Sequence, residues 1–126
     1  MTKLEIAANI NFEGDVYRTI LVDDKIDFKV GQIIDNVGMS WCDQYGTFFV
    51  ESERKYKYFF RCEKPVKGHA VDYENEEECE VLGATGCENE CEVLILPSQK
   101  FKIINVSSNA DYEEMRYYDI ELEPFF

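Results

Sequence analysis

Apolar and polar residues alternate along much of this chain, and an alternation with a period of two is typical of strands buried on one face. No amphipathic stretch of 12 or more residues indicates a long helix. The pattern therefore predicts a mainly β or α+β fold with few short helices. The stretches predicted to form strands are 4–12, 16–22, 28–37, 58–63, 67–73, 88–97, 100–106 and 115–123.

Turn signals and charges divide these strands. The segment 13–15 contains Glu-Gly-Asp, which favours a turn. Pro65 and Gly68 are expected to stop the strand that begins at Tyr58. The acidic run 74–80 is expected to be solvated.

The stretch 88–97 is the most informative part of the chain. In a strand, Glu90 and Glu92 would lie side by side on one face, which two leucines continue. Neighbouring carboxylates resist ionising together, and such pairs gather at functional sites. The alternative is an exposed strand end on an acidic protein. The residues predicted to point the other way, into a second apolar layer, are Cys91, Val93 and Ile95.

Arg18 stands inside the hydrophobic run 16–22. Because an unpaired buried charge is costly, an arginine in such a run usually has a partner. Two interpretations remain open from the sequence. Arg18 either lies on an edge strand and extends its charge to water, or points inward to meet an anion.

The cysteines and the single histidine give only weak evidence for a metal site. Cys79, Cys87 and Cys91 with His69 offer four zinc ligands, but the chain lacks the C-x2-C pair that structural zinc sites usually have, so no metal site is predicted. His69 is expected to be an ordinary surface or turn residue. Five cysteines without a spacing framework favour a reducing compartment.

Length and charge limit the remaining functions. The 126 residues are enough for one domain, predicted to span 1–126. No run of 18 apolar residues predicts a membrane span, and no signal peptide is seen, so a cytoplasmic protein is expected. With 26 acidic and 13 basic residues the net charge is −13. Since nucleic-acid binding depends on Lys and Arg neutralising phosphates, direct binding to nucleic acid is not expected.

Several stretches together resemble the mono-ADP-ribosyltransferases of the arginine–serine–glutamate class, which includes clostridial binary toxins and bacteriophage enzymes. The stretch 90–97 with 100–103 is similar to the family's E-x-E-V-L-L-P and K-F-K-V segments. The aromatic-arginine segment 16–18 and the serine segment 38–42 appear in the family's order. The resemblance extends from about 15 to 123 and implies a compact split β-sandwich.

The resemblance also implies a reaction and roles for four residues. The family cleaves NAD between nicotinamide and ribose and transfers ADP-ribose to a protein. Glu92 would stabilise the oxocarbenium-like ribose, and Ser40 would orient Glu92. Arg18 would contact the pyrophosphate or support the floor of the pocket. Glu90 would act as general base toward an arginine acceptor, or water would accept ADP-ribose in an NAD glycohydrolase reaction.

Weaker assignments follow from the same resemblance. Phe48 or Phe49 would stack on the nicotinamide ring, and backbone groups of Thr19 would meet the carboxamide. The chain departs from the family in two respects: Ser-Trp-Cys at 40–42 replaces Ser-Thr-Ser, and no helical segment is predicted before the arginine strand. The helix that usually follows the serine strand has little room.

A function from a different class is also consistent with the sequence. A non-catalytic acidic β-domain could bind a basic protein, because its charge would attract such a partner over a distance. The two hypotheses make different structural demands. The enzyme requires Arg18, Ser40 and Glu92 to meet in one cleft, whereas a binding domain requires only an exposed charged or apolar patch.

Overall fold

The fold is mainly β with few short helices, as the alternation predicted. The computed structural model describes residues 2–44, 56–83 and 91–126. Within these ranges the strands are β1 Phe12–Val22, β2 Ile33–Asp35, β3 Ser40–Cys42, β4 Tyr56–Ala70, β5 Glu92–Leu94, β6 Lys100–Val106 and β7 Tyr118–Phe125. The helices are α1 Lys3–Ala8, α2 Glu76–Leu82 and α3 Asn109–Met115.

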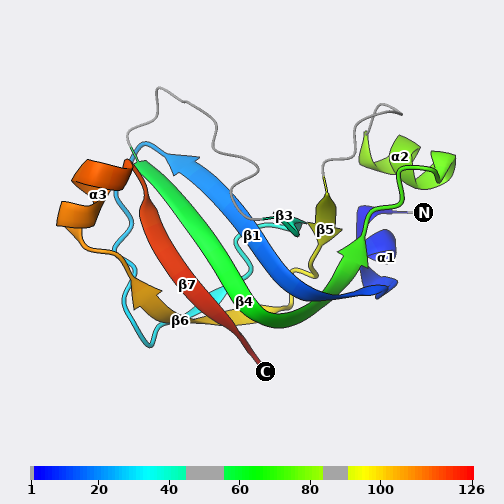
Figure 1. Cartoon of the computed structure of the whole chain (residues 1–126). Helices are drawn as coiled ribbons and strands as arrows, with labels where there is room; N and C mark the ends of the chain where they lie inside the picture. Colours follow the sequence, from blue (N-terminus) through cyan, green and yellow to red (C-terminus); the bar gives the residue numbers. More distant parts are fainter. Residues whose placement is uncertain (1, 45–55, 84–90) are drawn as a thin grey trace.

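The described strands form one hydrogen-bonded sheet in the order β1-β3-β5-β4-β7-β6-β2. The pair β4–β7 is parallel, and the other pairs are antiparallel. The long strands β1 and β4 also pair directly with each other. The short strands β3 and β5 connect the same two strands by a second path, because β3 pairs with β1, β5 pairs with β4, and β3 pairs with β5. Figure 1 shows β1, β4 and β7 side by side, with α3 at one end of the sheet and α1 and α2 at the other.

Strand β5 separates two apolar layers. Val93 and Ile95 are fully buried in the main core, whereas Leu94 and Leu96 pack in a second cluster with Ile6 of α1. This confirms the alternation predicted for residues 93–96, whereas Cys91, predicted to point into an apolar layer, precedes β5 with φ of 54° and is not part of the main core. The buried residues of the main core are Val16, Trp41, Tyr58, Phe60, Cys62, Val66, Val93, Ile95, Phe101, Ile103, Tyr118, Ile120 and Leu122.

The beginning of the chain is a helix, so the strand predicted over 4–12 is wrong. Thr2 and Glu5 form a reciprocal capping box in which each side chain accepts from the other's backbone N–H. Such a box satisfies donors that would otherwise be orphaned at the start of a helix. Ile6 and Ala7 are buried. A short helix therefore does precede the arginine strand, contrary to the sequence prediction.

The turn at 13–15 and the stop at Pro65 are also wrong, because β1 and β4 run through both. The register shifts from Gly14 opposite Val66 to Val16 opposite Cys62, so β4 carries extra residues at this point. Proline is tolerated where the ladder is interrupted in this way. The segments 58–63 and 67–70 consequently belong to a single strand.

Gly68 does not end β4. Its lack of a side chain allows the backbone of β5 to approach β4 closely. A Cβ atom at this position would lie 2.7 Å from the carbonyl oxygen of Leu94 and 2.9 Å from the Val93 side chain. Only a residue without a side chain allows such a close approach.

The acidic run at 74–80 contains most of a helix. The Asn75 side chain caps α2 by accepting from the amide of Glu78, and Gly83 ends it in the left-handed conformation. Glu78 is buried, which corrects the expectation that the whole run is solvated. The last strand was predicted over 115–123 but begins at Tyr118. The reason is that α3 extends to Met115, and its C-cap residue Arg116 has φ of 66°.

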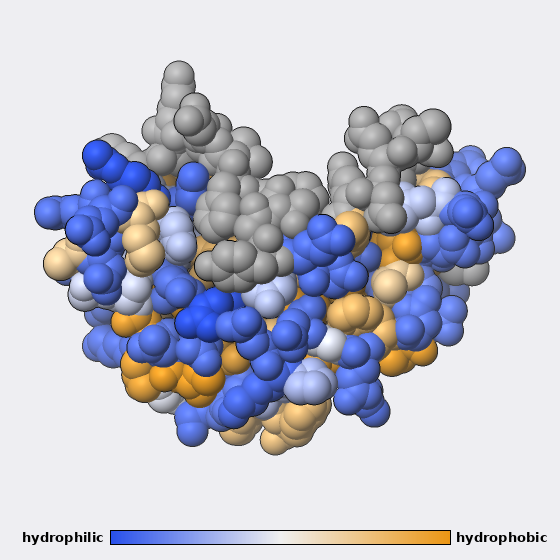
Figure 2. All heavy atoms as spheres, in the orientation of Figure 1, coloured by the Kyte–Doolittle hydropathy of each residue, from blue (hydrophilic) through white to orange (hydrophobic). Residues whose placement is uncertain are grey.

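Charged groups cover the ends and the outer face of the sheet. Figure 2 shows hydrophilic side chains gathered over α3 and over α2. Between β4 and β7, Arg61 donates to Asp119 (2.9 Å), Glu121 (3.0 Å) and Glu63 (2.5 Å). Burial acts to lower the pKa of Arg61, but the hydrogen bonds to Asp119 and Glu63 and the charges of Asp119 and Glu121 outweigh it and raise the pKa. In the described part of the chain, no helix is both long and apolar enough to cross a membrane.

Candidate active site

Arg18 points toward the interior of the fold. It lies on β1 between Val16 and Ile20, which both pack in the main core. Its Nη1 atom donates a hydrogen bond to the carbonyl oxygen of Ser40 on β3. β1 is paired with β4 on one side and with β3 on the other. Arg18 therefore points inward, as one of the two interpretations held, and the anion that it would meet stays a prediction.

Ser40 and Glu92 meet across the β3–β5 pair. Cys42 lies opposite Glu92, and Ser40 lies opposite Leu94. Ser40 and Glu92 are thus diagonal neighbours on the same face of the sheet. The Ser40 hydroxyl donates a hydrogen bond to Oε2 of Glu92. Three residues that are far apart in the sequence form one contiguous constellation, with Arg18 on the Ser40 backbone and Glu92 on the Ser40 side chain.

The constellation holds a cation beside a carboxylate in a half-buried position. Burial lowers the pKa of Arg18, and the charge of Glu92 opposes that shift. An arginine side chain stays protonated in proteins, so Arg18 carries a positive charge here. Its Nε atom is buried and has no hydrogen-bond partner among the residues that the structure describes. An orphaned buried donor is costly, and a ligand oxygen would satisfy it.

Gly38 makes room for the Arg18 side chain, a contact that sequence reasoning missed. A Cβ atom at Gly38 would lie 2.6 Å from Nη2 and 2.8 Å from Cζ of Arg18. The Gly38 backbone has φ of +141°, which residues with a side chain rarely adopt. Gly38 stands in the serine segment, but nothing in the local sequence indicates which residue approaches it.

Replacing Gly38 with alanine should therefore destabilise the protein and displace Arg18. Gly31 provides a matched control, because its φ is +90° but nothing lies within 4 Å of a Cβ there. We expect Gly31→Ala to lower the free energy of unfolding by about 1 kcal/mol and Gly38→Ala by about 2–3 kcal/mol. Urea denaturation measures both. Equal losses for the two variants would mean that the Arg18 contact contributes nothing.

Asn36 is a second residue that sequence reasoning missed. Its Nδ2 atom donates to the carbonyl oxygens of Ile95 (2.9 Å) and Leu96 (3.1 Å). Its Oδ1 atom accepts from Nε1 of Trp41 at 3.0 Å. Asn36 therefore ties β3 to the segment that follows β5, and so fixes the two strands that carry Ser40 and Glu92.

The other residues of the predicted site have no role that the structure tests. Thr19 follows Arg18 on β1 and is paired with Phe59 of β4, which does not test the role predicted for its backbone groups. Phe48, Phe49 and Glu90 lie outside the described residues. The roles predicted for these four residues stay predictions, and so does the helix expected after the serine strand.

The prediction that His69 is an ordinary surface residue is wrong. It is 3% exposed and lies on β4 opposite Leu94 of β5. Its Nδ1 atom is 2.6 Å from the carbonyl oxygen of Asn9, and its Nε2 atom is 2.5 Å from Oε1 of Glu78. Because a carbonyl oxygen can only accept, Nδ1 carries a hydrogen, and the second contact is a hydrogen bond between Nε2 and the Glu78 carboxyl group. These bonds connect β4 to the end of α1 and to α2.

The cysteines of the rejected zinc alternative have other contacts. The Cys79 thiol lies 3.7 Å from the carbonyl oxygen of Asp72 and 3.6 Å from that of Tyr73. Cys87 lies outside the described residues. In the described ranges, no group of three or more His, Cys, Asp or Glu side chains is arranged to hold a metal ion.

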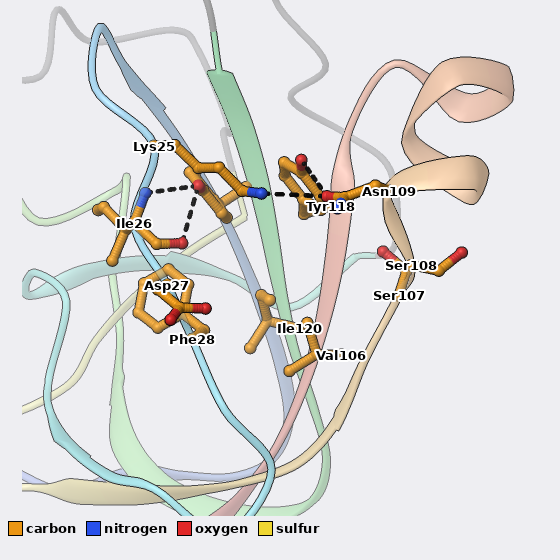
Figure 3. Close-up of a pocket in the computed structure, with 11 residues that line it drawn as sticks. Lys25, Ile26, Asp27, Phe28, Val106, Ser107, Ser108, Asn109, Tyr118 and Ile120 are labelled. Carbon is orange, nitrogen blue, oxygen red and sulfur yellow. Dashed lines mark hydrogen bonds between the residues drawn. The ribbon is translucent and has the colours of Figure 1, made fainter.

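A separate cavity of about 320 Å³ opens near α3 (Figure 3). Its polar groups already bond to one another. Lys25 Nζ donates to Asn109 Oδ1 at 3.1 Å, and the Tyr118 hydroxyl donates to the same oxygen at 2.8 Å. The Tyr58 hydroxyl bonds both backbone groups of Ile26. The cavity contains none of the three residues of the Arg18–Ser40–Glu92 constellation.

The fold is that of the ADP-ribosyltransferases, which confirms the architecture that the resemblance implied. The chain superposes on solved structures of these enzymes over nine tenths of its length. No protein-family model matches the sequence, and no curated protein matches it.

Three solved structures illustrate the likeness. The ADP-ribosyltransferase Vis from Vibrio splendidus, in complex with the M6 inhibitor, has a TM-score of 0.60 and 16% identity, covering 91% of this chain and 50% of that chain. The type III effector XopAI from Xanthomonas axonopodis pv. citri has a TM-score of 0.55 and 14% identity, covering 98% of this chain and 44% of that chain. Vis has also been solved in complex with agmatine, with a TM-score of 0.58. The chain therefore spans about half the length of these structures.

Proposed function

We propose that this protein is an NAD-dependent mono-ADP-ribosyltransferase that uses Arg18, Ser40 and Glu92. The observation that carries the proposal is the convergence of these three residues from β1, β3 and β5. The likeness of the fold to the ADP-ribosyltransferase Vis supports the same class of enzyme. The buried Nε donor of Arg18 supports an oxygen-rich ligand such as a dinucleotide.

The reaction breaks the bond between the ribose carbon and the nicotinamide nitrogen. Positive charge develops on the ribose as the bond breaks, and nicotinamide leaves with the bonding electrons. Glu92 would stabilise this charge electrostatically, which is effective because the carboxylate is already fixed in position. The hydrogen bond from Ser40 to Oε2 keeps the carboxylate from rotating and leaves Oε1 for the ligand.

Arg18 would bind the negatively charged part of NAD. Its Nη1 atom is held by the Ser40 carbonyl, and its Nε atom is buried without a partner among the described residues, so the Arg18 side chain would have to shift for Nε to meet an oxygen of the pyrophosphate. A charge-assisted hydrogen bond of this kind is stronger than a neutral one. Arg18 and Glu92 would therefore have different roles. Arg18 would bind the diphosphate, and the Glu92 carboxylate would stabilise the positive charge that develops on the ribose.

We propose arginine as the acceptor side chain, with Glu90 as the general base. The resemblance of the 90–97 stretch to enzymes with two glutamates supports this assignment. The Vis complex with agmatine supports it as well, since agmatine carries a guanidinium group like that of arginine. A negatively charged surface around the site would attract such a cation, and the chain's net charge of −13 agrees with this.

The acceptor can be tested with small amines. Labelled NAD is incubated with the protein and either agmatine or 1,5-diaminopentane, which carries ammonium groups instead of a guanidinium. We expect labelled ADP-ribose on agmatine and at least about tenfold less on the diamine, because a planar guanidinium suits bidentate recognition by a carboxylate. Equal transfer to both amines would contradict a guanidinium acceptor. Release of free ADP-ribose alone would indicate an NAD glycohydrolase.

A further inference from the structure

The paired part of β4 and β5 stops one residue short of Glu92. The two pairs in that ladder are His69 with Leu94 and Ala70 with Val93. On its other side, Glu92 is paired with Cys42 of β3. The first residue of β5 is thus held by one neighbouring strand and lies past the end of the other.

The segment that follows β4 completes the hydrogen bonding of Glu92. The amide of Val71 donates to the Glu92 carbonyl oxygen at 3.0 Å. The amide of Glu92 donates to the phenolic oxygen of Tyr73 at 3.2 Å. The Tyr73 hydroxyl therefore occupies the place that a strand carbonyl would have if the ladder continued. Cys91, immediately before Glu92, has φ of 54°, so the chain enters β5 through a sharp change of direction at this bond.

A buried pair fixes the segment that carries Tyr73. Oε1 of Glu78 accepts from the Asp72 amide at 3.2 Å and lies 2.5 Å from Nε2 of His69. Asn75 caps the helix that carries Glu78. Tyr73 is consequently held between two anchored residues, and its hydroxyl has a defined position relative to β4.

We propose that Tyr73 is a positioning residue for Glu92, an inference that rests on the proposed function of Glu92 in NAD cleavage. The phenolic oxygen fixes the Glu92 backbone on the side where β4 ends, and Ser40 fixes the side chain. Both bonds are needed to hold the carboxylate in one orientation, because β5 has only three residues. A loosely held carboxylate stabilises a developing charge less well than a fixed one.

Tyr73→Phe removes one oxygen and leaves the ring in place. We expect kcat for nicotinamide release to fall about three- to tenfold, as the loss of one hydrogen bond predicts, with KM for NAD unchanged. Tyr118→Phe is the matched control. It also loses a phenolic hydrogen bond, to Asn109 at 2.8 Å, but on the side of the fold near α3, and should keep the wild-type kcat. Combined with Glu92→Gln, Tyr73→Phe should cause no further loss.

Amide hydrogen exchange, followed by NMR, tests the bond itself without any catalysis. In Tyr73→Phe the Glu92 amide should exchange faster, while the Val93 amide should be unchanged. A wild-type kcat in Tyr73→Phe, or an equal fall in both tyrosine variants, would overturn the inference, as would unchanged exchange at Glu92. If the wild-type protein does not cleave NAD, the proposed function fails, and the exchange rate alone then decides whether Tyr73 positions Glu92.

Discussion

Glu92→Gln should lower kcat for nicotinamide release from NAD by about a hundred- to a thousandfold, the usual effect of removing one fixed electrostatic group from an active site. The substitution keeps the size and shape of the side chain and removes its negative charge. The glutamine carbonyl can still accept the hydrogen bond from Ser40. KM for NAD should change little, because Arg18 rather than Glu92 is proposed to bind the diphosphate.

Glu80→Gln is the control for the loss of one negative charge. Glu80 is exposed on α2, so this variant changes the net charge equally without touching the constellation. It should keep the wild-type kcat. A Glu92→Gln enzyme that retained more than about a tenth of the wild-type kcat would contradict the electrostatic role assigned to this carboxylate.

The second large effect is on stability. Glu78→Ala should lower the free energy of unfolding by about 3–5 kcal/mol, because removing one partner of a buried polar pair leaves the other without compensation. His69 would keep a buried Nε2 atom with no acceptor, and the Asp72 amide would lose its bond to Oε1. A typical domain is stable by about 5–15 kcal/mol, so this loss is a large fraction of the total.

Glu77→Ala is the matched control, since Glu77 precedes Glu78 on the same helix but is exposed. It should change the free energy of unfolding by about 0.5 kcal/mol or less. Thermal or urea unfolding monitored by circular dichroism measures both variants. Similar small changes in the two would show that the buried contact between Glu78 and His69 does not stabilise the fold.

The longer strands were predictable because each carries an apolar pattern long enough to detect, whereas β3, with three residues, lies outside the stretches that the pattern predicted as strands. The alternation in the 92–96 stretch correctly separated Val93 and Ile95 from Leu94 and Leu96. The failure at Pro65 has a long-range cause. Pro65 is tolerated because β4 carries extra residues between the pairs Val16–Cys62 and Gly14–Val66, and the sequence near Pro65 contains no information about this register with β1.

The helices were missed because they are too short for periodicity. Each has only six or seven residues, fewer than two turns. They do carry a local signal, which is a capping residue followed three positions later by an acid. The pairs are Thr2 with Glu5, Asn75 with Glu78, and Ser108 with Asp111. A search for this spacing would have found all three.

The site was predictable only through the family resemblance. Ser40 is 22 residues from Arg18 and 52 residues from Glu92 in the sequence, and periodicity contains no information about such contacts. The residues that hold the constellation in place were not predictable in this way. The contacts of Gly38 and Tyr73 with it depend on how separate strands and turns pack, and the local sequence around either residue does not indicate these contacts.

Nicotinamide release from NAD, measured at equal concentrations of the wild-type protein, Glu92→Gln and Glu80→Gln, is the most direct test that Arg18, Ser40 and Glu92 form a catalytic site. We expect steady release by the wild-type protein and by Glu80→Gln, with release by Glu92→Gln reduced at least about a hundredfold. Equal rates for all three proteins, or no release by any of them, would contradict the assignment of this site as an NAD-cleaving centre.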